Sequence, residues 1–286
     1  MMYGAIEAGG TKFVCAVSDK QLEIKERVSI PTTTPEETLK QVFDFFDQYT
    51  LTSIGIGSFG PIDVNEKSAT YGYVTSTPKM AWKNFDFLGS VKQRYGIPVA
   101  WTTDVNAAAY GELKKGSAQG MESCLYLTVG TGIGGGAVVD GKVLSGYGHP
   151  EMGHLLVRMH PDDDFDGVCP YHGNCLEGVA AGPAIEKRYG KKGHELAEDK
   201  KVWEIEAFYL AQALVNYTLI LSPEKIVLGG GVMKQTQLLS MIKEQFTQLM
   251  AGYVATPPLD EYIVTPELED NAGITGCLLM AIEEKQ

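Results

Sequence analysis

Short apolar runs separated by glycine-rich turns open the chain and predict a β-hairpin. Residues 3–6 and 13–17 are almost entirely apolar, and the turn sequence EAGGTK lies between them. Apolar residues then recur at even positions over 22–30, which predicts a third strand with one buried face. The fold is therefore expected to begin with three strands in succession.

A helical pattern follows. Thr34 and Glu37 have the spacing of a capping box, with Pro35 at the first helical position, and the apolar residues after them mark one helix face that ends near Tyr49. Alternating strands and helices are expected next, namely a strand at 53–57, a helix at 87–95, a strand at 98–102 and a helix at 105–115.

A second pass of the same kind begins at Ser123. It starts with a strand, the turn GTGIGG and another strand, as the first pass does. Later elements are a long apolar helix at 202–221, a strand at 225–230, a helix reaching Met250, a strand at 261–265 and a last helix from 272. Because both halves start alike, a weak internal repeat indicates duplicated lobes.

Length and charge narrow the class of protein. A chain of 286 residues suits two modest α/β lobes. A net charge of −12 argues against a partner that is duplex nucleic acid or an anionic membrane and favours a small substrate. The first residues carry no basic segment before a long apolar one, and no window reaches the length of a membrane span. We expect a cytoplasmic protein.

Two cysteines and two histidines have the spacing of a zinc site. The five cysteines are scattered and odd in number, which does not indicate a disulfide framework. Cys169, His172 and Cys175 form Cys-x-x-His-x-x-Cys, and His154 lies upstream. Four ligands of these types predict tetrahedral Zn²⁺ with no open position, hence a structural ion. His154 has a second ring nitrogen that could face a substrate.

Three glycine-rich turns are candidates for phosphate binding. They are EAGGTK at 7–12, GTGIGGG at 130–136 and LGGGV at 228–232. Glycine lets backbone N–H groups approach an anion closely, and the third turn precedes a predicted helix. None matches a P-loop or a Rossmann fingerprint, so each alone is also compatible with an ordinary tight turn.

Carboxylates near these turns suggest sugar chemistry. Asp104 lies between a predicted strand and a helix, where it would either cap the helix or act as a general base towards a hydroxyl group. Asn106 would orient a sugar hydroxyl or simply begin the helix. Glu151 and Glu177 flank the predicted metal ligands and, with Asp104, could accept sugar hydroxyl hydrogens; solvated surface glutamates are the alternative.

Taken together, these motifs resemble the ROK family (repressor, open reading frame, kinase). The resemblance rests on LTVGTGIGGGAVVDGKVLSGYGHPEMGH, EAGGTK, TDVNAA, CPYHGNC and LGGGV, which together span nearly the whole chain. It implies an α/β fold of the two-lobed actin-like ATPase (ribonuclease H-like) type, with ATP and sugar in the interlobe cleft. We expect a small lobe at 1–118 with the helix 272–286 packed back on it, and a large lobe at 119–271 with the zinc loop and a dimer surface.

The resemblance also implies roles for individual residues. Asp104 would be the general base, and Asn106, Glu151, His154 and Glu177 would contact the sugar. The phosphates and the adenine nucleotide would be bound by Gly9, Gly10, Thr11, Lys12, Thr131, Gly132, Gly182, Pro183, Gly229, Gly230 and Gly231. Mg²⁺ would bridge the phosphates, His154, Cys169, His172 and Cys175 would hold Zn²⁺, and the chain would form a homodimer.

Two further sequence features bear on which hexose is the substrate. The order of the zinc ligands and the string STPKMAW look like bacterial fructokinases, so D-fructose phosphorylated at its 6-hydroxyl is the expected reaction. Two departures from the family pattern are Glu7, where Asp is more common, and Thr103, where glucokinases have Asn. A gluco-, manno- or allokinase remains an alternative. A sugar-sensing transcriptional regulator is disfavoured because the first phosphate loop begins at Glu7.

Overall fold

In a computed structural model, which describes residues 1–284, the chain divides into two compact units. Unit 1 comprises residues 1–119, 143–150 and 267–284, and unit 2 comprises 120–142 and 151–266. Relative to the expected lobes, residues 143–150 and 267–271 cluster with unit 1. The last two residues of the predicted helix 272–286 lie outside the described residues.

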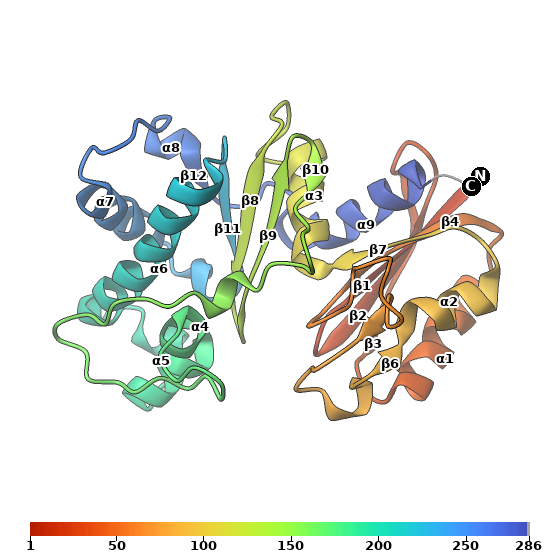
Figure 1. Cartoon of the computed structure of the whole chain (residues 1–286), viewed down its shortest axis with the longest axis horizontal. Helices are drawn as coiled ribbons and strands as arrows, with labels where there is room; N and C mark the ends of the chain where they lie inside the picture. Colours follow the sequence, from red (N-terminus) through yellow and green to blue (C-terminus); the bar gives the residue numbers. More distant parts are fainter. Residues whose placement is uncertain (285–286) are drawn as a thin grey trace. The chain divides into compact units, whose positions relative to one another are not determined.

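A five-stranded mixed sheet forms the centre of unit 1 (Figure 1). Its order is β3-β2-β1-β4-β7, with β1 at Met2–Ala8, β2 at Lys12–Ser18, β3 at Ile24–Pro31, β4 at Leu51–Ser58 and β7 at Val99–Thr103. The β1–β2 and β2–β3 pairs are antiparallel, whereas β1, β4 and β7 run parallel. The carboxyl ends of these three parallel strands therefore meet at one edge of the sheet.

Helices cover both faces of this sheet because the strand residues alternate between two apolar cores. Helices α1 (Pro35–Phe46) and α2 (Phe87–Tyr95) pack on the face that carries Ile6 and Phe13. Helices α3 (Asp104–Lys115) and α9 (Ala272–Glu283) pack on the other face, against Ala5, Val14 and Ala16. Unit 1 is thus a three-layer α/β unit.

Helix α9 lies unusually close to its neighbours. A Cβ atom at Gly55 of β4 would overlap the backbone of Cys277, and one at Gly276 would overlap the backbone of Ala107. Glycine at these positions lets the helix backbone touch strand and helix directly. As a result the first turn of α9 reaches the end of β1.

Unit 2 repeats the sheet plan. Its order is β10-β9-β8-β11-β12, with β8 at Cys124–Val129, β9 at Ile133–Val139, β10 at Lys142–Val143, β11 at Ile226–Gly229 and β12 at Ile263–Val264. An antiparallel hairpin, β8–β9, is again closed by a glycine turn and extended by two parallel strands. The repeated arrangement agrees with the internal repeat inferred from the sequence.

Helices α6 (Lys200–Leu221) and α7 (Leu238–Met250) pack together beside this second sheet (Figure 1). Glu206 is fully buried within α6, and neither of its carboxyl oxygens has a hydrogen-bond partner among the described residues. Burial therefore raises the pKa of Glu206 well above its usual range. Two helices shorter than a typical one, α4 (Leu176–Ala180) and α5 (Gly182–Tyr189), complete this region.

The remaining elements are short. They are β5 at Tyr73–Val74, β6 at Phe85–Asp86, α8 at Leu259–Tyr262 and 3₁₀ helices at Met80–Trp82, Met152–His154, Gly193–Leu196, Val232–Lys234 and Glu269–Asn271. Within the described part of the chain, none of the helices combines the length and the hydropathy that crossing a bilayer requires.

The structure corrects three details of the expected elements. The strand expected at 261–265 is shortened to β12, because Glu261 and Tyr262 close the short helix α8. The buried face expected for β3 is reduced mainly to Ile30, since Ile24 is 40% exposed at the sheet edge. Helix α1 ends at Phe46 rather than near Tyr49.

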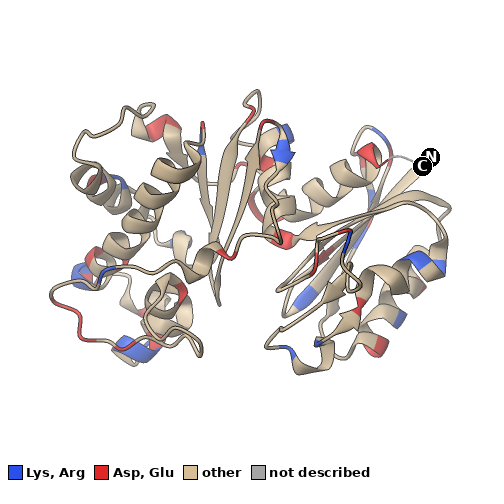
Figure 2. Cartoon of the chain, viewed as in Figure 1, with Lys and Arg blue, Asp and Glu red and all other residues tan. Residues whose placement is uncertain are grey.

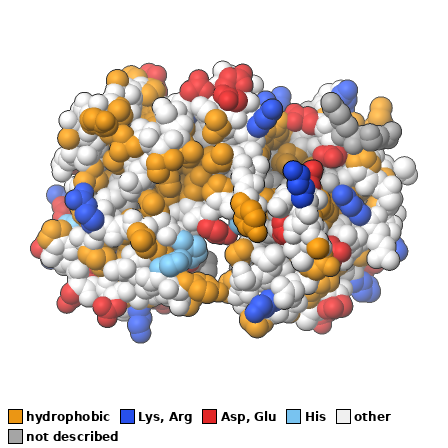
Figure 3. Space-filling model, viewed as in Figure 1, with side chains coloured by type: hydrophobic (Ala, Val, Ile, Leu, Met, Phe, Trp, Pro, Cys, Tyr) orange, Lys and Arg blue, Asp and Glu red, His pale blue; other side chains and the backbone are white. Residues whose placement is uncertain are grey.

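The surfaces of both units carry charged residues of both signs (Figure 2). Lys and Arg are interspersed with Asp and Glu over both units, and acidic residues mark the loop that leads into α4 (Figure 2). Hydrophobic side chains gather on the face of unit 2 that carries α6 (Figure 3). Near the end of α6, Leu219 is 48% and Ile220 72% exposed.

Candidate active site and metal centre

Asp104 begins helix α3, directly after β7. The cap of this helix is Thr103, whose hydroxyl oxygen accepts the Asn106 backbone N–H at 3.1 Å. Asp104 is half-buried, and its Oδ1 accepts the backbone N–H of Val105 at 2.8 Å. The capping role considered for Asp104 therefore belongs to its neighbour, and the Asp104 carboxylate lies at the edge where the parallel strands end.

Asn106, predicted to orient a sugar hydroxyl, lies in the first turn of α3. Its side chain is almost fully buried, and its Nδ2 donates to Thr102 Oγ1 at 3.2 Å. Its Oδ1 is buried and has no hydrogen-bond partner among the described residues. The amide group is thus fixed by β7 on one side and keeps a free acceptor on the other.

The first glycine turn joins β1 to β2 at this same edge. The Gly9 N–H donates to the Lys12 carbonyl at 3.0 Å, which closes the turn. Thr32, directly after β3, supports the turn by donating its hydroxyl to the Gly9 carbonyl at 2.7 Å and its N–H to the Thr11 carbonyl at 3.0 Å. Thr11 and Lys12 are exposed, so their side chains are available to an anion.

Glu7 also lies near the end of β1. Its Oε2 is buried without a hydrogen-bond partner among the described residues. Burial, with the neighbouring negative charge of Asp104, raises the pKa of Glu7 to about 7. The sequence marked Glu7 only as a departure from the family pattern.

Two of the glycine turns, at 130–136 and 228–232, meet the start of α5 in unit 2. The Gly182 N–H donates to the Gly130 carbonyl at 2.8 Å, and the Gly130 N–H donates to the Gly132 carbonyl at 2.9 Å. A Cβ atom on Gly130 would lie 3.8 Å from the backbone nitrogen of Gly231. Gly230 has φ +95°, and a side chain there would overlap the backbone of Val129. The residues of unit 2 that are predicted to bind the nucleotide therefore lie close to one another. Thr131 and Pro183 among them are exposed.

Glu177 is tied to the middle turn. Its Oε2 accepts the Ile133 N–H at 2.9 Å, and a Cβ atom on Gly132 would lie 2.7 Å from the same oxygen. Because Glu177 also lies in the first turn of α4, directly after the predicted metal ligand Cys175, it connects the predicted metal loop to the glycine turn at 130–136. One carboxylate oxygen is engaged by the protein, and the other remains for a ligand.

The four predicted metal ligands converge. One donor atom from each of His154, Cys169, His172 and Cys175 lies within 4.8 Å of all the others. The Sγ of Cys169 is 3.7 Å from Nδ1 of both histidines, and Cys175 Sγ is 3.5 Å from His154 Nδ1. Ligands about 2.1–2.3 Å from a tetrahedral Zn²⁺ are separated by roughly 3.4–3.8 Å, so the donors fit that ion.

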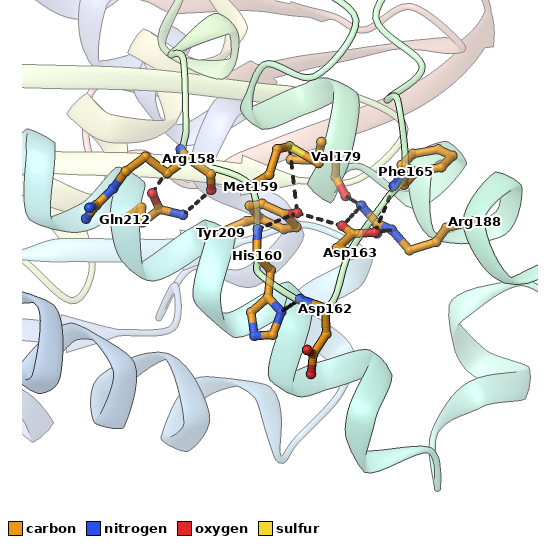
Figure 4. Close-up of polar contacts among 10 residues, drawn as sticks. All are labelled: Arg158, Met159, His160, Asp162, Asp163, Phe165, Val179, Arg188, Tyr209 and Gln212. Carbon is orange, nitrogen blue, oxygen red and sulfur yellow. Dashed lines mark hydrogen bonds and ion pairs between the residues drawn. The ribbon is translucent and has the colours of Figure 1, made fainter.

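A polar network anchors the acidic loop that precedes Cys169 (Figure 4). Arg188 of α5 donates through Nε to Asp163 Oδ1 at 3.2 Å, and its Nη2 lies 3.1 Å from Asp163 Oδ2. The Tyr209 hydroxyl donates to the same carboxylate at 2.6 Å and accepts the His160 N–H at 3.1 Å. The side chains of Arg188 and Asp163 are only 7% and 3% exposed, so they form a buried ion pair.

The same arginine reaches the metal-site helix. Arg188 Nη2 donates to the Val179 carbonyl of α4 at 2.8 Å, and its guanidinium lies 4.5 Å from the Phe165 ring centroid. At the other end of the loop, Gln212 exchanges hydrogen bonds of 3.0 and 3.1 Å with the backbone of Arg158 (Figure 4). Residues 158–165 are therefore fixed to α5 and α6.

Sequence reasoning missed these anchors. The run HPDDDFDG indicated a polar loop, and nothing in it distinguished Asp163 from its exposed neighbour Asp162. Sequence reasoning also did not identify His149, whose Nε2 accepts the Ile62 N–H at 3.0 Å. Glu151 is exposed, and its carbonyl accepts the His154 N–H at 3.1 Å.

Within each unit, then, the predicted residues gather into one group. In unit 1 the first glycine turn, Glu7, Asp104 and Asn106 share the edge where β1, β4 and β7 end. In unit 2 two glycine turns, the start of α5, Glu177 and the four predicted metal ligands form a connected region. The half-buried carboxylate of unit 1 is of a type that accepts a proton, and the backbone N–H groups at the glycine turns are of a type that stabilises an anion.

Comparison with known proteins agrees with this chemistry. The sequence model of the ROK family matches residues 3–284. The chain is 52% identical over 289 residues to a putative fructokinase of Bacillus subtilis, covering 100% of this chain and 97% of the relative. It is 51% identical over 281 residues to a fructokinase of Pediococcus pentosaceus, covering 98% of each.

The fold of the chain is also similar to that of a solved ROK protein. A ROK hexokinase from Thermus thermophilus superimposes with a TM-score of 0.82 at 28% identity, covering 98% of both chains. The expected two-lobed α/β fold is thereby confirmed. The chain belongs to the ROK family.

Proposed function

We propose that this protein is a fructokinase, which transfers the γ-phosphoryl group of ATP to the 6-hydroxyl of D-fructose. The observation that carries the proposal is identity of about half of all residues, over the full length, with proteins named as fructokinases. The position of Asp104 supports it, since a half-buried carboxylate stands at the edge of unit 1 where the parallel strands end.

In this reaction Asp104 acts as the general base. As the fructose O6–P bond forms, the bond between the γ-phosphorus and the β,γ-bridging oxygen breaks, and ADP leaves. The proton of the 6-hydroxyl passes to the Asp104 carboxylate. Mg²⁺ bound to the nucleotide phosphates would neutralise part of their charge.

Backbone groups at the glycine turns would bind the nucleotide. We assign phosphate to Gly9, Gly10, Thr11, Lys12, Thr131 and Gly132, and the remainder of the nucleotide to Gly182, Pro183, Gly229, Gly230 and Gly231. In unit 2 the support is that these turns hydrogen-bond to one another or lie within van der Waals reach. Oriented N–H groups stabilise negative charge that develops during transfer.

The sugar would be bound by Asn106, Glu151, His154 and Glu177. Asn106 and Glu177 each keep one side-chain oxygen for a hydroxyl hydrogen. His154 turns its Nδ1 towards the cysteines, which leaves Nε2 for the sugar. Zn²⁺ held by the Cys/His cluster would fix the tautomer and ring orientation of His154 without entering the reaction.

A coupled assay of ADP release tests the substrate. We expect kcat/KM to be highest for fructose when fructose, glucose, mannose and N-acetylmannosamine are compared. A higher value for one of the other sugars would replace fructokinase by the corresponding hexose kinase. If none of the four sugars led to ADP release, the sugar-sensing alternative would be favoured.

We also propose a homodimer that buries the exposed apolar end of α6. Leu219 and Ile220 are exposed there, and exposed apolar side chains are typical of a surface that another chain covers. Light scattering should give twice the mass of one chain, and Ile220→Lys should shift it to the monomer mass. A monomer in the unmodified protein would contradict the proposal. The five cysteines, which form no disulfide among the described residues, and the proposed use of ATP suit the cytoplasm.

A further inference from the structure

Two carboxyl groups occupy the end of the parallel strands in unit 1, although the proposed reaction uses only one. Glu7 of β1 is in register with Gly57 of β4, and Gly57 is in register with Thr102 of β7, shortly before Asp104. A Cβ atom on Gly57 would lie 3.2 Å from the Asp104 Cα atom. The strand between the two acids therefore contributes no side chain that would separate them.

Helix α9 encloses Glu7 from the other side. A Cβ atom on Gly273 would lie 2.6 Å from the Glu7 carboxyl carbon, so only glycine leaves room for this side chain. The Ile274 backbone N–H of the same helix donates to the carboxyl group. An aspartate at position 7, which is shorter by one carbon, would not extend as far towards α9.

The groups around Glu7 come from every neighbouring element. Asp104 on α3 and burial disfavour its charged form, whereas Arg27 on β3 and Lys12 on β2 favour that form. On α9, burial raises the pKa of the Cys277 thiol, and the neighbouring charges of Glu7 and Asp104 raise it further. Burial and the second carboxylate outweigh the two basic residues, which is why the pKa of Glu7 rises to about 7.

We propose that Glu7 is a positioning residue for Asp104: it keeps its proton while Asp104 is ionised, so the pair carries a single negative charge. Of two carboxyl groups whose charges interact, the one whose charged form is more strongly disfavoured holds the proton, and enclosure by α9 together with the Asp104 charge disfavours the charged form of Glu7. Asp104 is then the member that can accept a proton from a substrate. The inference rests on the proposed function only for that last step, because the charge state belongs to the free protein.

Carboxyl NMR of the ligand-free protein, with ¹³C-labelled glutamate side chains, tests the charge state directly. Glu7→Gln assigns the resonance by its disappearance. We expect Glu7 to titrate at about 7 and to titrate at lower pH in Asp104→Asn, where the neighbouring charge is absent. Titration near the ordinary glutamate value of about 4.3, or no response to Asp104→Asn, would overturn the proposal. This measurement decides the inference even if fructose is not the substrate.

Kinetics of Glu7→Gln test the positioning role. Glutamine matches the shape of the protonated acid, so kcat should fall by less than the roughly hundredfold minimum expected for loss of a general base. The ionisation near pH 7 should disappear from the pH profile of kcat/KM. Glu206→Gln is the matched control, because it replaces another buried glutamate, in unit 2, whose carboxyl oxygens have no hydrogen-bond partner among the described residues, and it should keep the wild-type profile. A loss in Glu7→Gln as large as that in Asp104→Asn would show that position 7 must be charged.

Discussion

Asp104→Asn is expected to lower kcat for fructose phosphorylation by about 10²- to 10⁴-fold, because the amide cannot accept the hydroxyl proton. The KM values should change little, since the substitution preserves shape. Folding should be retained as well, because Thr103 rather than Asp104 caps helix α3. Steady-state kinetics with ADP detection, alongside thermal unfolding, would measure both effects.

A matched control for this substitution is Asp86→Asn, also in unit 1. Asp86 caps α2 by accepting the Gly89 N–H at 2.8 Å, a bond that asparagine can also make. Its activity and melting temperature should stay close to those of the unmodified protein. If Asp104→Asn turned over fructose at the unmodified rate, the general-base assignment would have to be abandoned.

Cys175→Ser should abolish stoichiometric zinc binding and raise the KM for fructose by about 10- to 100-fold, the range typical when the support of a functional side chain is lost. The reason is that His154 and Glu177 both lie in the segment that the metal organises. The melting temperature should fall in the same variant, because binding energy of a structural zinc contributes to folding. Elemental analysis, sugar kinetics and thermal unfolding provide the three readouts.

Cys124→Ser provides the comparison, because Cys124 is a buried cysteine of unit 2 that lies in β8 and outside the metal cluster. It should retain one zinc per chain. Protein stripped of metal by a chelator that kept both its sugar affinity and its melting temperature would rule out a structural role for the ion.

Features fixed by local chemistry could be predicted from the sequence. The hairpin around Gly9 follows from two apolar runs and a glycine turn, and Thr34 indicated the start of α1. The metal cluster followed from ligand type and spacing, since His154, though distant in sequence, is of the type that completes a tetrahedral set. Each of these signals is carried by residue type and spacing along the chain.

Features that depend on tertiary neighbours could not be predicted. The alternation in β3 suggested a buried face, but its position at the edge of the sheet leaves Ile24 exposed. The burial of Asp163 depends on Arg188 and Tyr209, which come from two later helices. The room for the Glu7 side chain depends on Gly273, far along the chain. None of these partners can be matched by spacing alone.

The anchoring of Asp163 bears on how the protein acquires its metal. Zinc bound by the predicted cluster would join His154 to Cys169, and an unrestrained chain between them would lose conformational entropy when the ion binds. The ion pair with Arg188 already holds the middle of that chain. An ion bound there would close two short segments instead of one long one, so the ion pair supplies beforehand part of the ordering that metal binding requires.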